Sequence, residues 1–267
     1  MKWQGGRRST NVRDLRGVGL VGGGIGAVVL TVVALLLGVN PGDLMQGTPP
    51  PAAETGAAGD EASEFVSVVL ADTEDTWNAL FAEAGSDYPE PQLVLFTGMA
   101  QSACGMAQSA MGPFYCPRDQ SVYIDLAFYR DLHERFGAPG DFAQAYVIAH
   151  EVGHHVQNVL GLLGDGMSRS TGPQSQAVRV ELQADCFAGL WAHYAQRSRN
   201  VVPEAGDIDE ALNAAAAIGD DRLQRQTQGQ VVPETFSHGT SEQRARWFRV
   251  GYEQGSVQQC DTSRGTV

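Results

Sequence analysis

Basic residues are scarce in this sequence. Its 267 residues include 18 lysines and arginines against 31 aspartates and glutamates, which gives a formal net charge of −13. Five basic residues and one acidic residue fall within residues 1–16, so this segment carries +4 and the rest of the chain carries −17. Nucleic-acid binding requires cationic surface that neutralises phosphates. The acidic remainder therefore argues against a nucleic-acid partner.

The sequence also lacks a C-x-x-C pair, so a cysteine-ligated zinc site is not expected. Its four cysteines are Cys104, Cys116, Cys186 and Cys260. Four cysteines allow three pairings. We favour Cys104 with Cys116, which closes a short loop, and Cys186 with Cys260, which ties the C-terminal tail to a helix. Disulfides fit an oxidising, extracytoplasmic compartment.

No charged residue occurs in residues 17–39, a run of 23 residues rich in Val, Leu and Gly. Such a run is long enough to cross a bilayer as a helix. Positive-inside bias would keep residues 1–16 in the cytoplasm and place the following domain outside. A cleaved signal peptide is the alternative, but residues 38–42 lack a small-x-small cleavage site. No cysteine follows the run, so a lipoprotein is not expected. The sequence predicts a retained single-pass membrane anchor.

The segment after this run has no apolar pattern of its own. Residues 40–63 are rich in Pro, Gly and small residues, which predicts a flexible linker. Within the run, Gly22 and Gly26 have the G-x-x-x-G spacing that can pack two anchors together. Glycine-rich spans are also common without dimerisation, so the oligomeric state stays open. The expected organisation is a cytoplasmic segment 1–16, an anchor 17–39, a linker 40–63 and a globular domain 64–267.

The globular region contains an H-E-x-x-H motif formed by His150, Glu151 and His154. Residues four apart on a helix lie one turn above each other, so both imidazoles can reach one metal ion. The intervening glutamate can then take a proton from zinc-bound water. So short a motif also occurs by chance on solvated helices. Apolar neighbours such as Val147 and Val152 indicate a buried helix instead, where histidines without a partner would be costly.

A catalytic zinc ion usually takes three protein ligands and leaves a fourth position to water. The motif does not continue as H-x-x-G-x-x-H, because Gln157 and Leu160 occupy those positions. Glu181 is the candidate third ligand, and Asp185 lies one helical turn beyond it. Asp185 can accept the outer N–H of a liganding histidine, which we assign to His150. The alternative is an exposed Glu and Asp on an ordinary helix.

These motifs resemble the bacterial family of predicted neutral zinc metallopeptidases, membrane-anchored proteins that open with a Lys-Trp-x-Gly-Gly-Arg-Arg-Ser-x-Asn-Val segment. Residues 2–12 have this pattern. The other matching stretches are residues 112–117, 122–126, the H-E-x-x-H motif, 181–186 and 238–244. The resemblance spans nearly the whole chain apart from the linker. It implies zinc and a gluzincin-like site of two histidines and a glutamate, but no particular substrate.

Hydrophobic periodicity and end signals predict a mainly helical α+β fold. Helices are expected over residues 61–84, allowing for a break near 72–75, and over 128–136, 141–160, 173–197, 208–226 and from 241 onward; strands are expected over 92–96 and 121–126. The fold class is thus a zincin-like catalytic domain with a small sheet, preceded by one transmembrane helix. In zinc peptidases an edge strand near the metal pairs with substrate backbone. Residues 121–126 are the candidate, an ordinary core strand being the alternative.

His238 is a second candidate catalytic residue beside Glu151. It lies in a short segment before the last predicted helix, where it can face the metal and hydrogen-bond the oxyanion formed as water adds to a carbonyl. A solvated turn residue is the alternative.

The other histidines are expected away from the metal. His155 points about 100° away from His154 and is expected in a supporting or surface position. His193 lies too far along its helix, and His133 is expected to be exposed. Tyr146 is expected in the core, with the cleft wall as its alternative place.

The combined prediction is a membrane-anchored, extracytoplasmic zinc endopeptidase with residues 64–267 as the metallopeptidase domain. Its cofactor is Zn²⁺, its substrate a peptide or protein, and its other partner the lipid bilayer. Two alternatives stay open. One is a non-catalytic envelope scaffold, whose structural zinc would have four protein ligands and no open position. The other is a zinc amidase acting on cell-wall material by the same chemistry.

Overall fold

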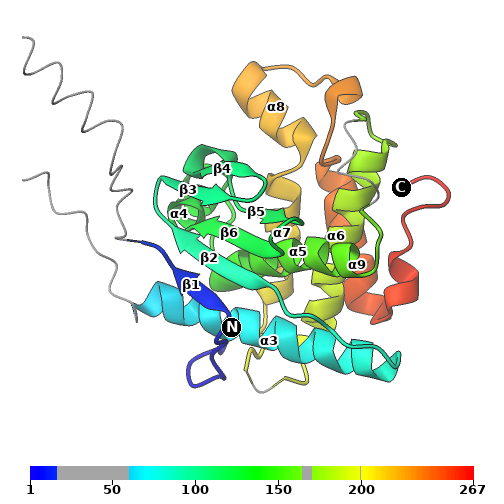
Figure 1. Ribbon diagram of the computed structural model, residues 1–267. Helices are drawn as coiled ribbons and strands as arrows, with labels where there is room; N and C mark the ends of the chain where they lie inside the picture. Colours follow the sequence, from blue (N-terminus) through cyan, green and yellow to red (C-terminus); the bar gives the residue numbers. More distant parts are fainter. Residues whose placement is uncertain (17–59, 164–169, 199) are drawn as a thin grey trace, which may run out of the picture.

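The computed structural model describes residues 1–16, 60–163, 170–198 and 200–267. Within these ranges, helices and two small sheets form a mixed α+β fold, so the predicted fold class is confirmed at this level. Figure 1 shows the long helix α3 along the base of the molecule, with the sheet above it, α6 and α9 to the right and α8 at the top.

The elements have the following bounds. The strands are β1 (Val12–Asp14), β2 (Gln92–Phe96), β3 (Met99–Ser102), β4 (Gly105–Gln108), β5 (Phe114–Cys116) and β6 (Ser121–Asp125). The α-helices are α3 (Glu61–Glu83), α4 (Ala127–Glu134), α5 (Asp141–Val159), α6 (Gln176–Ala195), α7 (Asp207–Ala217), α8 (Asp220–Gln228) and α9 (Ser241–Gln254). Short 3-10 helices are η1 (Ser109–Met111), η2 (Pro233–Thr235) and η3 (Val257–Cys260).

The main sheet has the order β1-β2-β6-β5, and β3 pairs with β4 in a separate hairpin. Strands β1, β2 and β6 are parallel, whereas β5 runs antiparallel to β6. All five residues of β6 are buried, and β6 has a partner on both sides. Of the two alternatives given for residues 121–126, an edge strand and a core strand, the structure shows the core strand. In the described part of the chain, β5 is the sheet edge on that side.

Three helices pack unusually closely, and glycines allow it. A Cβ atom added at Gly153 of α5 would lie 3.0 Å from the Ala184 carbonyl oxygen of α6. At Gly189 of α6 an added Cβ would lie 1.9 Å from the Phe248 carbonyl oxygen of α9, and Gly251 of α9 meets α6 in the same way. Glycine permits such backbone contacts because it has no Cβ. The result is a tight α5–α6–α9 unit.

The helices otherwise follow the predicted ranges with three differences. Helix α3 continues without a break through residues 72–75. The single helix predicted over 208–226 is instead two helices, α7 and α8. The chain turns at Gly219, where an added Cβ would lie 2.4 Å from the Ser241 backbone nitrogen. Helix α6 begins after Ser175, whose side chain caps it, rather than at residue 173.

Both favoured disulfides are present. Cys104–Cys116 joins the turn of the β3–β4 hairpin to β5, and Cys186–Cys260 joins α6 to η3. Among the described residues no cysteine is free.

Residues 1–16 belong to the same folded unit as residues 60–267, whereas the sequence analysis treated them as a separate cytoplasmic segment. Strand β1 pairs with β2, and the ring of Trp3 packs edge-on against Phe65 of α3. The predicted anchor over 17–39, its Gly22 and Gly26 pair and most of the linker lie outside the described residues. No helix in the described ranges is both long and apolar enough to cross a membrane.

Replacing Gly251 tests the close packing of α6 and α9. Helix propensity alone predicts that Gly251→Ala raises the free energy of unfolding by about 1 kcal/mol. The clash with the Cys186 carbonyl oxygen reverses this sign, and we expect a loss of about 1–3 kcal/mol or more in urea unfolding. Glu253→Ala, at an exposed position of the same helix, is the control and should change stability by less than about 0.5 kcal/mol. A stabilised Gly251→Ala protein would contradict the packing described here.

Candidate metal site

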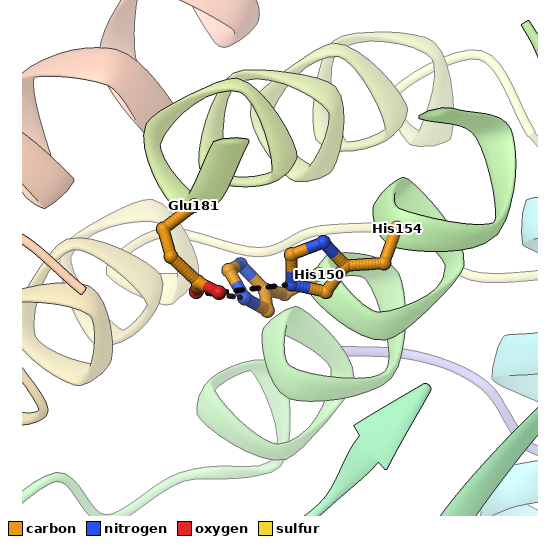
Figure 2. Close-up of side chains that lie close together, drawn as sticks. All are labelled: His150, His154 and Glu181. Carbon is orange, nitrogen blue, oxygen red and sulfur yellow. Dashed lines mark ion pairs between the residues drawn. The ribbon is translucent and has the colours of Figure 1, made fainter. Parts of the chain in front are cut away.

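Helices α5 and α6 bring three side chains of the predicted site together. His150 and His154 project from α5, and Glu181 faces them from α6 (Figure 2). The Glu181 carboxylate oxygens lie 3.3 Å from His150 Nε2 and 3.5 Å from His154 Nε2. One ligand atom from each of the three residues lies within 4.8 Å of the others. The two imidazoles and the carboxylate therefore converge on one point.

These distances fit a zinc ion. Ligand atoms about 2.1 Å from a tetrahedral zinc are about 3.4 Å apart, close to both separations measured here. Two neutral imidazoles and one carboxylate are also a donor set that zinc accepts. The three residues would supply three ligands to zinc, and all three line the adjoining cavity. The residues present thus fit the cofactor that the sequence predicts.

Asp185 holds His150 in the orientation that this site needs. Its Oδ1 atom accepts the hydrogen bond of His150 Nδ1 at 2.9 Å, which leaves Nε2 directed at Glu181. Asp185 is fully buried on α6 and also accepts a hydrogen bond from the Tyr146 hydroxyl at 2.5 Å. A carboxylate on the outer nitrogen fixes the tautomer of a metal-binding histidine and its ring orientation.

Arg244 of α9 pairs with the buried Asp185 carboxylate. Arg244 Nε lies 2.9 Å from Asp185 Oδ2, and Nη2 lies 3.0 Å from Oδ1. Such two-point contacts between guanidinium and carboxylate are strong and directional. Burial alone would raise the pKa of Asp185, but Arg244 and His150 hold that pKa below its ordinary value. Arg244 therefore keeps Asp185 ionised inside the protein.

Gln157 orients the ring of His154, as Asp185 orients the ring of His150. Its side-chain oxygen lies 2.9 Å from His154 Nδ1, and its amide nitrogen donates to the Val180 carbonyl of α6. The sequence analysis considered Gln157 only as a position where a third histidine is missing. In the structure it is fully buried and connects the motif helix to the helix that carries Glu181.

A cavity of about 440 Å³ adjoins the three side chains. Such a volume is in the range of ligand-binding clefts. Glu151 and His238 line it together with His150, His154 and Glu181. The remaining walls come from the edge strand β5, from α4 and from α8, and they are largely apolar; among them are Phe114, Tyr115, Phe128, Phe136 and Leu223.

The two carboxylates beside the histidines have opposite electrostatic environments. Burial raises the pKa of Glu151, although His150 and His154 oppose this shift. Burial would also raise the pKa of Glu181, but His154 and the hydrogen bonds from both histidines hold it well below its ordinary value. Glu181 is thus stabilised as an anion at the convergence point, while Glu151 has the more basic carboxylate.

His238 is held by Asp220, the first residue of α8. Asp220 accepts hydrogen bonds from the His238 backbone N–H at 2.7 Å and from its Nδ1 at 3.1 Å. His238 lines the cavity with a side chain that is 51% exposed to solvent, so it is both a cavity residue and the solvated residue given as the alternative. The Asp220 contact raises the pKa of His238, an effect that Glu181 increases and that burial and Arg244 oppose.

The structure also places the remaining residues considered from the sequence. His155 is fully buried, not at the surface; its Nε2 donates to the Pro89 carbonyl at 2.5 Å, and its Nδ1 lies 3.0 Å from the Tyr115 hydroxyl. His193 contacts the Tyr252 carbonyl away from the site, and His133 is exposed as expected. Tyr146 is buried in the core and also lines the cavity.

Comparison with known proteins agrees with this geometry. Residues 1–263 match the family described as "Putative neutral zinc metallopeptidase". The chain belongs to this family. Membership implies zinc, for which His150, His154 and Glu181 are the matching cluster.

Two of the matching relatives are named as uncharacterized proteins. The uncharacterized protein YpfJ of Escherichia coli K12 is 49% identical over 284 residues, covering 98% of each chain. The uncharacterized protein Rv2575 of Mycobacterium tuberculosis H37Rv is 42% identical over 247 residues, covering 86% of this chain and 84% of its own. No solved structure was found that matches this family member.

The sequence analysis did not identify Arg244 as a site residue. Replacing it tests whether its contact with Asp185 supports the site. Arg244→Leu leaves the Asp185 carboxylate buried and unpaired, so we expect a loss of about 3–5 kcal/mol in the free energy of unfolding. Zinc affinity should fall roughly 10–100-fold, because His150 loses its fixed support. Arg246→Leu, exposed on the same helix, is the control. If both variants keep the stability and zinc affinity of the unchanged protein, Arg244 does not support the site.

Proposed function

We propose that this protein is a zinc-dependent peptidase in which His150, His154 and Glu181 hold the metal. The observation that carries the proposal is the convergence of these three side chains at the wall of a cavity that also contains Glu151 and His238. Zinc bound there supplies a Lewis acid that activates water and polarises a carbonyl group.

Glu151 is the proposed general base. It lies on α5 between the two histidines and lines the cavity without belonging to the three-residue cluster. Burial raises its pKa, which makes the carboxylate a better proton acceptor. Glu151 takes a proton from the attacking water and returns it to the leaving amine.

His238 is proposed to donate a hydrogen bond to the oxyanion that forms on the substrate carbonyl. Its Nδ1 atom is bonded to Asp220 and the residue lines the cavity, so Nε2 is the nitrogen that would donate when the ring is protonated. The raised pKa of His238 favours that protonated form. A donor aimed at developing negative charge stabilises the transition state.

The edge strand β5 favours an extended peptide as the substrate. Phe114 and Tyr115 of β5 line the cavity, and among the described residues β5 pairs with β6 alone. Its outer edge can pair with an extended substrate backbone. His155 holds Tyr115 against α5 and so fixes the strand beside the proposed metal. A cell-wall amide without extended backbone would not use this edge.

A scaffold role is the second candidate, and the donor count argues against it. Structural zinc sites are closed by four protein ligands, whereas the cluster at this site has three. The two disulfides favour action in an oxidising, extracytoplasmic compartment. Contact with a bilayer through residues 17–39 stays a prediction from the sequence.

Two glutamate variants separate metal binding from proton transfer. Glu151→Gln should retain one zinc per chain and lose roughly 10²–10⁴-fold in peptide hydrolysis, because only the proton acceptor is removed. Glu181→Ala should lose zinc, since a ligand is removed. Zinc content and cleavage of a mixed fluorogenic peptide library are measured together, with and without chelator.

The control for this experiment is Glu83→Gln, at an exposed position of α3, which should match the unchanged protein in both measurements. Undiminished hydrolysis by Glu151→Gln would remove the proposed base. A full zinc load in Glu181→Ala would mean that another residue completes the site.

The His238–Asp220 pair predicts a change in the pH profile. The Asp220 contact raises the pKa of His238, so the protonated donor persists to higher pH and activity falls as pH rises through that pKa. Asp220→Asn removes the negative charge and should move the alkaline limb of kcat/KM to lower pH. His238→Gln should lower kcat roughly 10²–10³-fold with zinc content unchanged.

Asp209→Asn, at an exposed position of α7, is the control for Asp220→Asn. An alkaline limb that does not move in Asp220→Asn, or that moves to higher pH, would contradict the role given to His238.

A further inference from the structure

The N-terminal residues bind the domain as an integral strand. Strand β1 extends the sheet beside β2, with Val12 opposite Leu93 and Asp14 opposite Leu95. The pairing with β2 continues past both ends of β1. Leu93 N–H donates to the Asn11 carbonyl at 2.9 Å, and Leu15 N–H donates to the Leu95 carbonyl at 2.8 Å. A parallel strand paired in this way must be in the same compartment as its partner.

A buried carboxylate of α3 is satisfied by this segment. Glu74 is 1% exposed, and its Oε1 atom accepts hydrogen bonds from the Ser9 hydroxyl at 2.5 Å and Asn11 Nδ2 at 2.9 Å. Its Oε2 atom lies 3.0 Å from Arg7 Nη2. Removing the segment would leave a buried charge without these three partners, which is strongly unfavourable.

Apolar contacts and a glycine complete the fit. Trp3 is buried, and its ring centroid lies 5.4 Å from that of Phe65. At Gly6 an added Cβ would lie 2.7 Å from a Val68 methyl carbon and 2.9 Å from the Asn200 carbonyl oxygen. The Lys-Trp-x-Gly-Gly-Arg-Arg-Ser-x-Asn-Val motif of residues 2–12 is therefore explained by docking onto the domain.

Arg16 and Asp60, the described residues on either side of residues 17–59, form an ion pair. Arg16 Nη1 lies 2.8 Å from Asp60 Oδ2, and Asp60 is the residue that caps α3. The chain therefore leaves the folded unit and returns to it at one place. A helix of about 23 residues that crossed a bilayer would instead separate its ends by about 35 Å.

We propose that residues 1–16 and the described part of residues 60–267 lie on the same side of the membrane, because β1 is paired with β2. If residues 1–16 were cytoplasmic and the domain were outside the cell, β1 could not pair with β2. The sequence of residues 40–59 argues against a return crossing. Its four prolines interrupt the backbone hydrogen bonding that a membrane-spanning helix needs, and its two acidic side chains are costly in hydrocarbon.

Cysteine labelling in intact cells tests this topology. Gln4→Cys and Gln228→Cys introduce one thiol each at exposed positions of the N-terminal segment and of α8. A membrane-impermeant maleimide carrying polyethylene glycol is added to cells that express the full chain, before or after permeabilisation, and labelling is read as a gel shift. The unchanged chain, whose described cysteines are paired, gives the background.

We expect both thiols to react under the same condition, either both in intact cells or both only after permeabilisation. Reaction of one thiol in intact cells and of the other only after permeabilisation overturns the proposal. This readout does not involve zinc or hydrolysis, so it is independent of the proposed peptidase activity.

A second measurement tests the docking itself in the purified full chain. Trp3→Ala should lower the urea midpoint of the domain, because the ring fills a buried position against α3. Gln4→Ala, at the neighbouring exposed position, should leave the midpoint unchanged. An unchanged midpoint in Trp3→Ala means that the segment does not stabilise the domain, and the topological argument fails with it.

Discussion

The Asp185 carboxylate connects the helices that build the site. It accepts hydrogen bonds from His150 and Tyr146 of α5 and from Arg244 of α9, while its own backbone belongs to α6. A buried carboxylate is stable only with such partners. The same contacts that satisfy its charge aim His150 toward Glu181, so the stability of the core and the geometry of the site depend on one group.

Glycines at the helix contacts allow α5, α6 and α9 to lie close enough for Asp185 to reach its partners. Gly153 lets α5 approach α6, and Gly189 and Gly251 let α6 approach α9. With larger residues at these positions, Glu181 would lie farther from the histidines and Arg244 farther from Asp185. The disulfide Cys186–Cys260 adds a covalent link directly beside Asp185. Helix packing therefore sets the separations that a metal requires.

Local spacing explains what could be predicted. His150, Glu151 and His154 lie within one and a half helical turns, and Glu181 and Asp185 share a helix face, so helical periodicity alone indicated their chemistry. The favoured cysteine pairs also appear in the structure. Arg244 could not be assigned, because it meets Asp185 across 59 residues and nothing in a single sequence pairs them.

The errors have physical causes as well. The break at Gly219 arises from contact with Ser241, a tertiary effect that helix propensity does not contain. Strand β5 has three residues, too few for a recognisable alternation, so the edge was sought at 121–126 instead. The docking of residues 1–16 was missed because their charge was interpreted by membrane rules. In the structure, Arg7 and Arg16 instead pair with carboxylates of the domain.

The most direct test of the account is anomalous X-ray diffraction from crystals of the zinc-loaded protein, collected on both sides of the zinc absorption edge. The account predicts one strong peak about 2.0–2.2 Å from His150 Nε2, His154 Nε2 and a Glu181 oxygen, with Glu151 outside the coordination sphere. A peak elsewhere, or a fourth protein ligand closing this site, would contradict it.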